Sequence, residues 1–206
     1  GENFWEFLPR TVWGALKSSV ELEAQRIRRL GRSPWDPRTY LKNDVLNAWL
    51  MSVVFFGILI AVFGPALIPF VLIQGIYGFS LLESVNYLEH YGLLRQKTES
   101  GRYERCAPVH SWNSDHIVTN LFLYHLQRHS DHHANPTRRY QTLRSIDGAP
   151  NLPSGYATLI GLTYIPPLWR RMMDHRVIEH YDGDITKVNV HPRVRDKVMA
   201  KYGAVA

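Results

Sequence analysis

The sequence predicts an all-α integral membrane protein in which two C-terminal transmembrane helices support a cytoplasmic helical cap that carries a histidine cluster. Three observations lead to this fold class. Residues 45–82 contain no Asp, Glu, Lys or Arg, and basic residues lie on both sides of this uncharged stretch. Further along the chain, three histidines fall within five residues, at His129, His132 and His133.

The uncharged stretch is long enough for two transmembrane helices, because one spanning helix needs about 20 apolar residues at 1.5 Å rise per residue. Gly64 and Pro65 mark the expected break between them. We therefore predict one helix over residues 47–63 and a second over residues 66 to about 94. A buried hairpin in a soluble all-α domain is the alternative, but a soluble core helix is rarely apolar on all sides over such a length.

The basic residues around this transmembrane hairpin predict its orientation. Those before it are Arg26, Arg28, Arg29, Arg32, Arg38 and Lys42, and those after it are Arg95, Lys97, Arg102 and Arg105. By the positive-inside rule, both ends of the hairpin face the cytoplasm. We accordingly expect a single domain over residues 1–206, with the hairpin at about 45–94 and the cytoplasmic cap at 95–206.

Two features of the chain limit the classes of protein and of metal site. The chain opens on Gly1 with neither an initiator Met nor the basic and apolar regions of a signal peptide, so we expect an internal piece of a longer protein. Cys106 is its single cysteine, which excludes an internal disulfide framework and a cysteine-rich zinc or iron–sulfur site. A metal here must be bound by nitrogen and oxygen.

The histidine cluster predicts a metal site on a helix. The residues before it have a helical pattern, with Asn113 or Ser114 as the expected N-cap, and Asn135 before Pro136 is the expected end. On such a helix, histidines at i, i+3 and i+4 share one face, and His125 lies one turn before them. Neutral imidazole is the commonest metal ligand, so clustered histidines favour metal binding, although the spacing alone does not separate iron from zinc or copper.

A polar stripe also interrupts the second predicted transmembrane helix. Its members lie at i, i+3, i+4 and i+7 and are Glu83, Asn86, Tyr87 and His90. Ionisable residues at membrane depth are costly and usually mark a functional path, whereas at the membrane surface they serve as anchors. Because the histidine cluster is expected on the same cytoplasmic side, we predict that the two helices meet at a common centre.

The remaining segments predict packing or surface roles. Residues 156–169 are apolar but too short to span a bilayer, so we expect an interfacial or cap-packing segment. The charged tail from Asp174 onward is expected to lie over the cap. Five histidines have neither paired spacing nor a motif, and we expect them at the solvated surface; they are His110, His116, His175, His180 and His191.

Two longer motifs resemble a known family. The segments NYLEHYGLLR from Asn86 and LQRHSDHHANPTRRY from Leu126 resemble signature segments of the membrane alkane 1-monooxygenases, which are integral-membrane, non-haem di-iron enzymes. Flanking segments extend the resemblance over nearly the whole chain. It implies iron as the cofactor, with two irons per full site, and His90, His129, His132 and His133 as ligands by motif position. Two earlier histidine boxes of the family are missing from this chain, so we expect a C-terminal portion that shares its site with the N-terminal part.

The sequence also offers candidates for supporting and partner-binding roles. Glu89 and Asp131 are expected to orient ligand imidazoles, and His125 is expected in a supporting or packing role. Asp115 could also orient a ligand imidazole, but its position favours a role in stabilising the N-terminus of a helix. The formal net charge of +6 fits an acidic electron carrier or anionic lipid headgroups, with four candidate contacts at Arg138, Arg139, Arg170 and Arg171. Nucleic acid is disfavoured because the basic residues are dispersed without a binding motif.

The resemblance also implies the reaction. We expect terminal hydroxylation of an n-alkane to a 1-alkanol with dioxygen, in the bacterial inner (cytoplasmic) membrane, with electrons from rubredoxin and its rubredoxin reductase. The chain has no dinucleotide-binding fingerprint of its own. Two alternatives remain, which are a membrane fatty-acyl desaturase or hydroxylase and a non-catalytic membrane metal-binding module.

Overall fold

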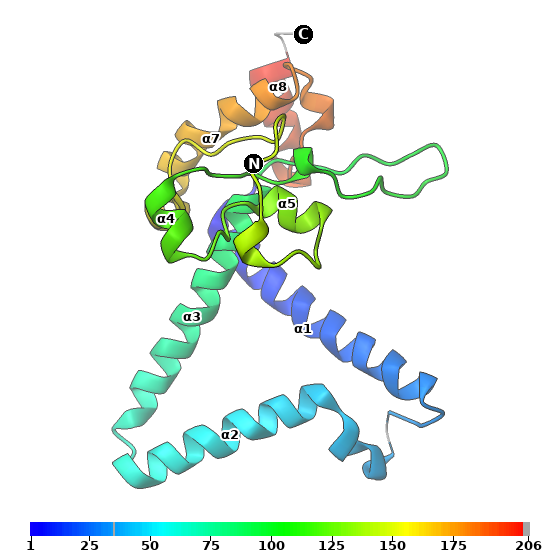
Figure 1. Cartoon of the computed structure of the whole chain (residues 1–206), viewed down its shortest axis with the longest axis vertical. Helices are drawn as coiled ribbons and strands as arrows, with labels where there is room; N and C mark the ends of the chain where they lie inside the picture. The colour runs from blue at the N-terminus through cyan, green and yellow to red at the C-terminus, as the bar shows by residue number, and fades with distance from the viewer. Residues whose placement is uncertain (35, 204–206) are drawn as a thin grey trace. The chain divides into compact units, whose positions relative to one another are not determined.

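The computed structural model describes residues 1–34 and 36–203, and within these ranges the chain is helical and has no β-strand (Figure 1). The predicted all-α fold is therefore confirmed. The helices are α1 (Phe4–Arg29), α2 (Asp44–Phe63), α3 (Leu67–His90), α4 (Ile117–Phe122), α5 (His129–Ala134), α6 (Tyr156–Thr163), α7 (Pro166–His180) and α8 (Arg195–Tyr202). Short 3-10 turns lie between some of these helices, and one of them is η2 (Pro108–His110).

The chain forms two compact units, which we describe separately. Residues 8–81 form what we call the apolar unit, and residues 1–7 together with 82–206 form the histidine unit. The helices α1 and α3 each contribute residues to both units.

In the apolar unit, α2 has the features of a lipid-facing helix. The side chain of Asn43 accepts a hydrogen bond from the N–H of Leu46 at 3.0 Å, so Asn43 caps the N-terminus of α2. Gly64, with φ of 88°, ends it where the break was predicted. No residue of α2 is buried, although the helix is almost wholly apolar. Both α2 and α3 are long and apolar enough to cross a membrane, and their exposure disfavours the alternative of a buried soluble hairpin.

The second apolar helix ends four residues earlier than predicted, at His90 rather than about Leu94. Gly92 follows with φ of 73°, in the left-handed region that favours glycine. A Cβ at this position would lie 2.6 Å from a methyl carbon of Val177 in α7, so the close approach also requires glycine. The chain therefore turns just after His90 and leaves this histidine at the end of α3.

Aromatic side chains build the core of the histidine unit. Phe4 is fully buried and its ring lies edge-on to Tyr87, with 5.7 Å between the centroids, and Tyr87 in turn packs on Trp169 at 5.7 Å. Residues 156–169, expected as one short apolar segment, instead form α6 and the start of α7. Pro166 begins α7, because the first turn of a helix tolerates proline. Tyr156 and Trp169 are fully buried, so this region packs inside the unit.

The single helix predicted from Asn113 to Asn135 is wrong. The structure has two six-residue helices, α4 and α5, and between them Tyr124 and His125 adopt positive φ angles of 50° and 59°. His125 therefore does not continue a helical stripe with His129. Asn113 is no N-cap of α4, because its side-chain oxygen accepts the N–H of Ser130 in α5, at 2.9 Å.

Candidate metal centre

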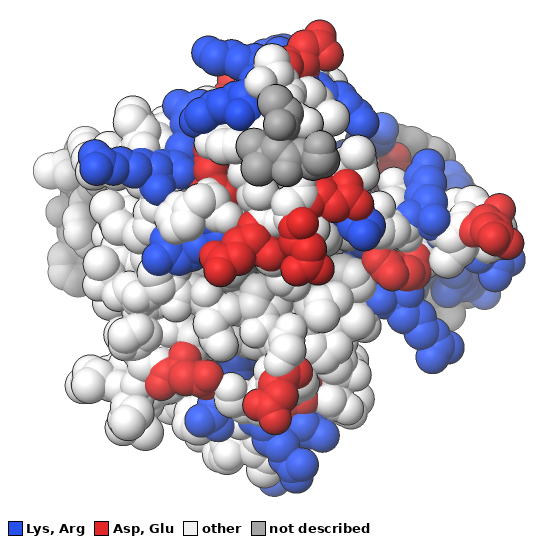
Figure 2. Space-filling view, turned by 90° about the horizontal axis from the view of Figure 1, so that it is seen from above, with Lys and Arg blue, Asp and Glu red and all other residues white. Residues whose placement is uncertain are grey.

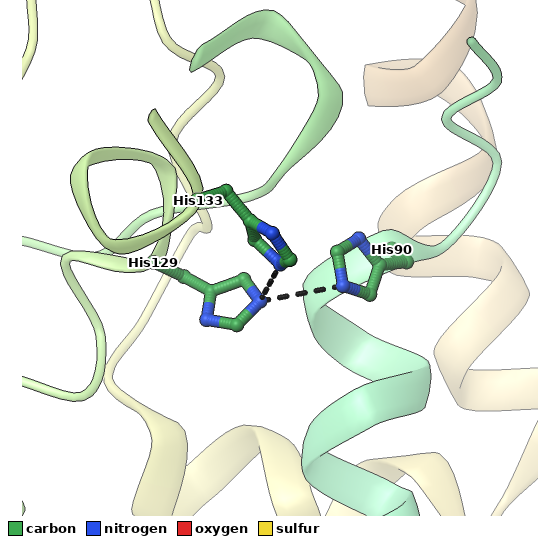
Figure 3. A group of neighbouring side chains, drawn as sticks. All are labelled: His90, His129 and His133. Atoms are coloured by element: carbon green, nitrogen blue, oxygen red, sulfur yellow. Dashed lines mark hydrogen bonds between the residues drawn. The ribbon is translucent and has the colours of Figure 1, made fainter. Parts of the chain in front are cut away.

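Three histidines converge at one point of the histidine unit (Figure 3). His90 comes from the end of α3, whereas His129 and His133 lie one turn apart on α5. The Nε2 atom of His129 lies 2.8 Å from Nε2 of His133 and 3.3 Å from Nε2 of His90. The three potential ligand atoms all lie within 4.8 Å of one another. Figure 3 shows the three rings turned toward a shared point.

These spacings fit a metal ion. Metal–nitrogen bonds of about 2.0–2.1 Å separate two ligand nitrogens by about 2.9 Å at a right angle and about 3.4 Å at a tetrahedral angle. The observed separations of 2.8 Å and 3.3 Å fall close to these values. Imidazole nitrogen without sulfur suits iron, copper or zinc. The structure therefore supports a metal-binding role for this group, and the donor set does not by itself name the metal.

The surroundings keep the rings neutral, which is the form that binds metal. Burial, reinforced by the neighbouring histidines His90, His133 and His132, lowers the pKa of His129 to about 2. Burial, followed by His132 and Arg95, also lowers the pKa of His133. Near neutral pH both rings therefore carry one proton and present one lone pair.

A backbone carbonyl orients the third ring. The Nδ1 atom of His90 lies 3.3 Å from the carbonyl oxygen of His110, which accepts a hydrogen bond from it. This contact fixes the tautomer in which Nδ1 carries the proton and Nε2 faces the other two histidines. The arrangement is typical of metal-binding histidines.

Glu89 also reaches the group, although not as the sequence suggested. This buried residue places Oε2 3.3 Å from Nε2 of His129, the same nitrogen that faces the other imidazoles. Its Oε1 atom accepts a hydrogen bond from the hydroxyl of Tyr156 at 2.8 Å. Burial, followed by the proximity of Glu89, raises the pKa of Tyr156, so the phenol remains a donor. Glu89 is thus held where a carboxylate oxygen can join the imidazoles, whereas the distal Nδ1 of His129 is buried and has no hydrogen-bond partner among the described residues.

Asp131 supports the cluster through the fold of α5, because its hydrogen bonds go to residues other than the converging imidazoles. It is fully buried and accepts hydrogen bonds from Arg138 at 2.6 Å, from Asn135 at 2.8 Å and from the N–H of Arg144 at 2.8 Å. Burial alone would raise the pKa of Asp131, but these hydrogen bonds outweigh it and lower the pKa. The ion pair with Asp131 holds the guanidinium of Arg138 within the histidine unit, so this arginine is less available to a partner than predicted.

Two other predicted site residues lie outside the converging group. His132 is exposed, and its ring centroid lies 5.9 Å from that of His129 and 5.8 Å from that of His133. His125 is half-buried with a left-handed backbone, and its Nδ1 atom has no hydrogen-bond partner.

The other predicted partner-binding arginines are exposed. Arg139 is accessible beside Arg138, and Arg170 and Arg171 line a cavity of about 640 Å³ together with Lys197 and Lys201. The face seen in Figure 2 carries both basic and acidic side chains in an interspersed arrangement.

Sequence reasoning missed two histidines near the site. His110 is only 9% exposed, so its prediction as a solvated residue is wrong, and His180 is half-buried with Nε2 3.1 Å from the carbonyl oxygen of Val109. His116 and His175 are exposed, as predicted. An isolated histidine has no periodic signal, so only the tertiary contacts distinguish these cases.

Comparison with known proteins agrees with the motifs. The chain is 55% identical over 203 residues to an alkane 1-monooxygenase of Acinetobacter baylyi and 46% identical over 203 residues to an alkane 1-monooxygenase of Alcanivorax borkumensis. Each alignment covers 98% of this chain and 49% of the relative, so the chain spans about half the length of these curated relatives. A xylene/toluene monooxygenase hydroxylase component of Pseudomonas putida is 27% identical over 186 residues, which is 88% of this chain and 47% of that protein.

These relatives confirm the resemblance to alkane 1-monooxygenases that the two motifs predicted. A family model described as fatty acid desaturase matches residues 1–164, which include both apolar helices and all three converging histidines. The two apolar helices and this match together indicate an integral membrane protein. The chain belongs to the fatty acid desaturase family.

Proposed function

We propose that the chain forms part of an alkane 1-monooxygenase that hydroxylates the terminal carbon of n-alkanes. The observation that carries this proposal is the convergence of His90, His129 and His133 in a chain that is 45–55% identical to proteins named alkane 1-monooxygenase. In the reaction, one atom of dioxygen enters the terminal C–H bond and the other is reduced to water with two electrons and two protons.

We assign iron as the metal, with two ions in the complete site. His90, His129 and His133 are the proposed ligands of one ion, and the exposed ring of His132 is the proposed ligand of the other. The N-terminal part of the enzyme supplies the remaining ligands. Bound iron would supply the one-electron redox chemistry and the open coordination positions that dioxygen activation requires.

The chain's own residues prepare this site. The neutral rings of His129 and His133 present lone pairs, the carbonyl of His110 orients His90, and Tyr156 holds Glu89 beside His129. An n-alkane offers no polar group, so apolar surface must bind it, and the apolar side chains of α2 and α3 offer such surface in the membrane.

An electron carrier must complete the reaction, and we propose rubredoxin, itself reduced by a rubredoxin reductase. The site then lies on the cytoplasmic side of the bacterial inner membrane, because basic residues lie before α2 and after α3 and none lies between these helices. Arg139, Arg170 and Arg171 are exposed and available to an acidic partner, whereas Arg138 is engaged by Asp131. Anionic lipid headgroups would compete for the same arginines.

Metal content and alkane turnover test the proposal. The full-length protein, purified in detergent, is compared with His129→Ala and with His175→Ala, a control that removes an exposed histidine outside the group. We expect about two irons per chain and alkanol formation in the wild type and the control, and loss of both in His129→Ala. Iron that survives His129→Ala would contradict the assignment. Bound metal without alkanol formation in the wild type would instead favour a non-catalytic metal-binding module.

A second candidate is a membrane fatty-acyl desaturase or hydroxylase, which the description of the matching family model favours. The two functions differ in substrate, since one enzyme acts on a free alkane and the other on an acyl chain attached to a carrier. Turnover of an acyl thioester, with none of an n-alkane of equal length, would establish the second function and overturn the first.

A further inference from the structure

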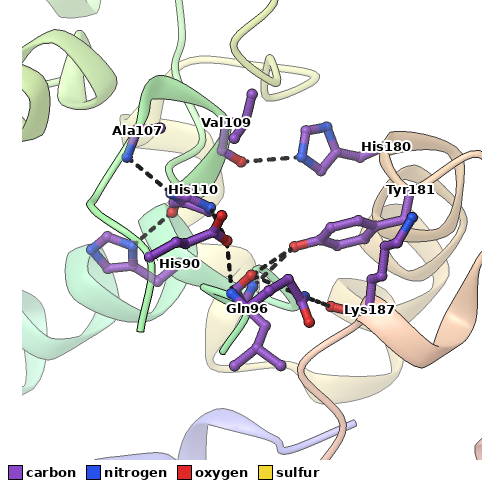
Figure 4. Close-up of polar contacts among 10 residues, drawn as sticks. His90, Gln96, Ala107, Val109, His110, His180, Tyr181 and Lys187 are labelled. Carbon is purple, nitrogen blue, oxygen red and sulfur yellow. Dashed lines mark hydrogen bonds and ion pairs between the residues drawn. The ribbon is translucent and has the colours of Figure 1, made fainter. Parts of the chain in front are cut away.

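The turn η2 accepts hydrogen bonds from side chains on its three consecutive carbonyl oxygens. Figure 4 shows two of these contacts, from His180 to Val109 and from His90 to His110. The donors come from three different helices, α3, α5 and α7. The pairs are Ser130 Oγ with Pro108 O at 2.8 Å, His180 Nε2 with Val109 O at 3.1 Å, and His90 Nδ1 with His110 O at 3.3 Å.

Two of these donors are directly connected to the metal centre. His90 is itself one of the converging histidines, and Ser130 follows His129 in α5. The hydroxyl of Ser130 also contacts the carbonyl oxygen of Ser111 at 2.8 Å. The turn is therefore bonded to both of the helices that carry the converging histidines.

The side chain of His110 fixes the turn from within. Its Nδ1 atom accepts the N–H of Ala107 at 2.9 Å, so Nε2 carries the proton and donates to Oε1 of Glu104 at 3.0 Å. The same oxygen of Glu104 accepts the N–H of Gln96 at 2.7 Å. This backbone hydrogen bond, reinforced by His110, lowers the pKa of Glu104 and keeps it an ionised acceptor.

We propose that His110 and Glu104 are positioning residues, which hold the turn η2 so that His90 and His129 meet at one metal ion. The proposal rests on the metal-binding function proposed above. Neither residue belongs to the converging group, and both act through backbone carbonyls rather than on the metal. Outer contacts of this kind typically change metal affinity by about 10- to 100-fold.

The test is a chelator competition that measures the apparent affinity of the full-length protein in detergent, with ferrous iron under anaerobic conditions and with zinc. The variants are His110→Ala, Glu104→Ala and Glu104→Gln, with His175→Ala as the control. We expect His110→Ala and Glu104→Ala to bind about 10- to 100-fold more weakly. Glu104→Gln should stay within about threefold of the wild type, because its amide oxygen still accepts from His110 and Gln96.

A second readout separates positioning from general stability. The melting temperature of each metal-free variant is measured, and positioning predicts that Glu104→Ala and Glu104→Gln differ in metal affinity more than in metal-free stability. If His110→Ala does not fold, the comparison of Glu104→Ala with Glu104→Gln still tests the proposal. Affinities of Glu104→Ala and Glu104→Gln that are equal, or both equal to the wild type, would overturn the proposal. Zinc binding without iron binding in the wild type would overturn the iron assignment alone, since the zinc affinities still compare the variants.

Discussion

The two sides of the candidate metal centre are built in different ways. His90 stands at the end of α3, a helix of 24 residues, whereas His129 and His133 lie on α5, which has six residues. A helix as short as α5 is not stable alone, because the free-energy cost of nucleation exceeds the stabilisation from its few hydrogen bonds. The comparison shows that the position of a ligand can be fixed by a long helix or by buried polar contacts around a short one.

The polar contacts around α5 are correspondingly dense. Asn113 accepts the N–H of Ser130 in its first turn, and the fully buried Asp131 connects α5 to Arg138 and Arg144. By contrast, the hydrogen bond that orients the His90 ring goes to a single backbone group, the carbonyl oxygen of His110. Substitutions on the α5 side should therefore disturb both fold and site.

The largest expected effect comes from Asp131→Ala. It leaves the partly buried Arg138 and the N–H of Arg144 without their acceptor, so we expect a loss of about 2–4 kcal/mol in the free energy of unfolding. Metal binding should fall with it, because α5 loses its support. Denaturant unfolding and metal analysis provide the measurements. Arg139→Ala, at the exposed neighbour of Arg138, is the control and should change stability by less than about 0.5 kcal/mol. Equal effects of the two variants would mean that α5 does not depend on Asp131.

A smaller effect is expected where the two sides meet. Tyr156→Phe removes the hydrogen bond to Glu89 and leaves a buried carboxyl oxygen unpartnered, which should cost about 1–2 kcal/mol. Unfolding by denaturant measures the loss, and Tyr140→Phe, at a tyrosine that is 46% exposed, serves as the matched control. A loss no greater than that of the control would show that Glu89 needs no donor from Tyr156.

His129 on α5 should also make the stability of the metal-free protein depend on pH. The pKa of His129 is lowered in the folded chain, so below the ordinary histidine pKa of about 6.5 the unfolded chain binds a proton that the folded chain does not. The stability of the metal-free protein should therefore fall with decreasing pH, by at most about 1.4 kcal/mol per pH unit for this residue. Melting temperatures of the metal-free protein between about pH 7.5 and pH 5.5 test this. His129→Asn should flatten the dependence, and an unchanged slope would count against His129 as its source.

The smallest effect is expected at residues that belong to neither side of the centre. Replacing Arg170 and Arg171 by Gln should raise the KM for the proposed electron carrier, rubredoxin, a few-fold. The salt dependence of this KM should also weaken, because exposed charges mainly influence the encounter of the two proteins. Stability and metal content should not change. Steady-state kinetics at several salt concentrations provide the measurement. A KM and a salt dependence equal to those of the wild type would place the carrier elsewhere.

The apolar helices could be predicted from the sequence because their signal is local. An uncharged stretch interrupted by Gly64 and Pro65 specifies two long helices and the break between them, and the structure confirms both. The resemblance carried by the segments around His90 and His129 is confirmed by the relatives. Local composition was enough to predict the two helices, and the two motifs were enough to predict the family resemblance.

The break between α4 and α5 could not be predicted, because Tyr124 and His125 adopt left-handed conformations that are usually taken by glycine or asparagine. Tertiary contacts override local preference there. The burial of His110 likewise depends on Glu104 and Ala107 in the folded chain rather than on any helical period. The supporting role of His110 therefore follows from tertiary contacts, which a periodic sequence pattern does not reveal.

The separation of α5 from α4 also bears on how the sequence can diverge. In one continuous helix, an inserted or deleted residue before His129 would rotate the histidines by about 100° relative to the preceding residues. Here the turn around Tyr124 and His125 can absorb a change in length, since α5 takes its orientation from Asn113 and Asp131. Length variation should therefore be tolerated between α4 and α5 but not between His129 and His133, where one added residue would turn the two imidazoles away from each other.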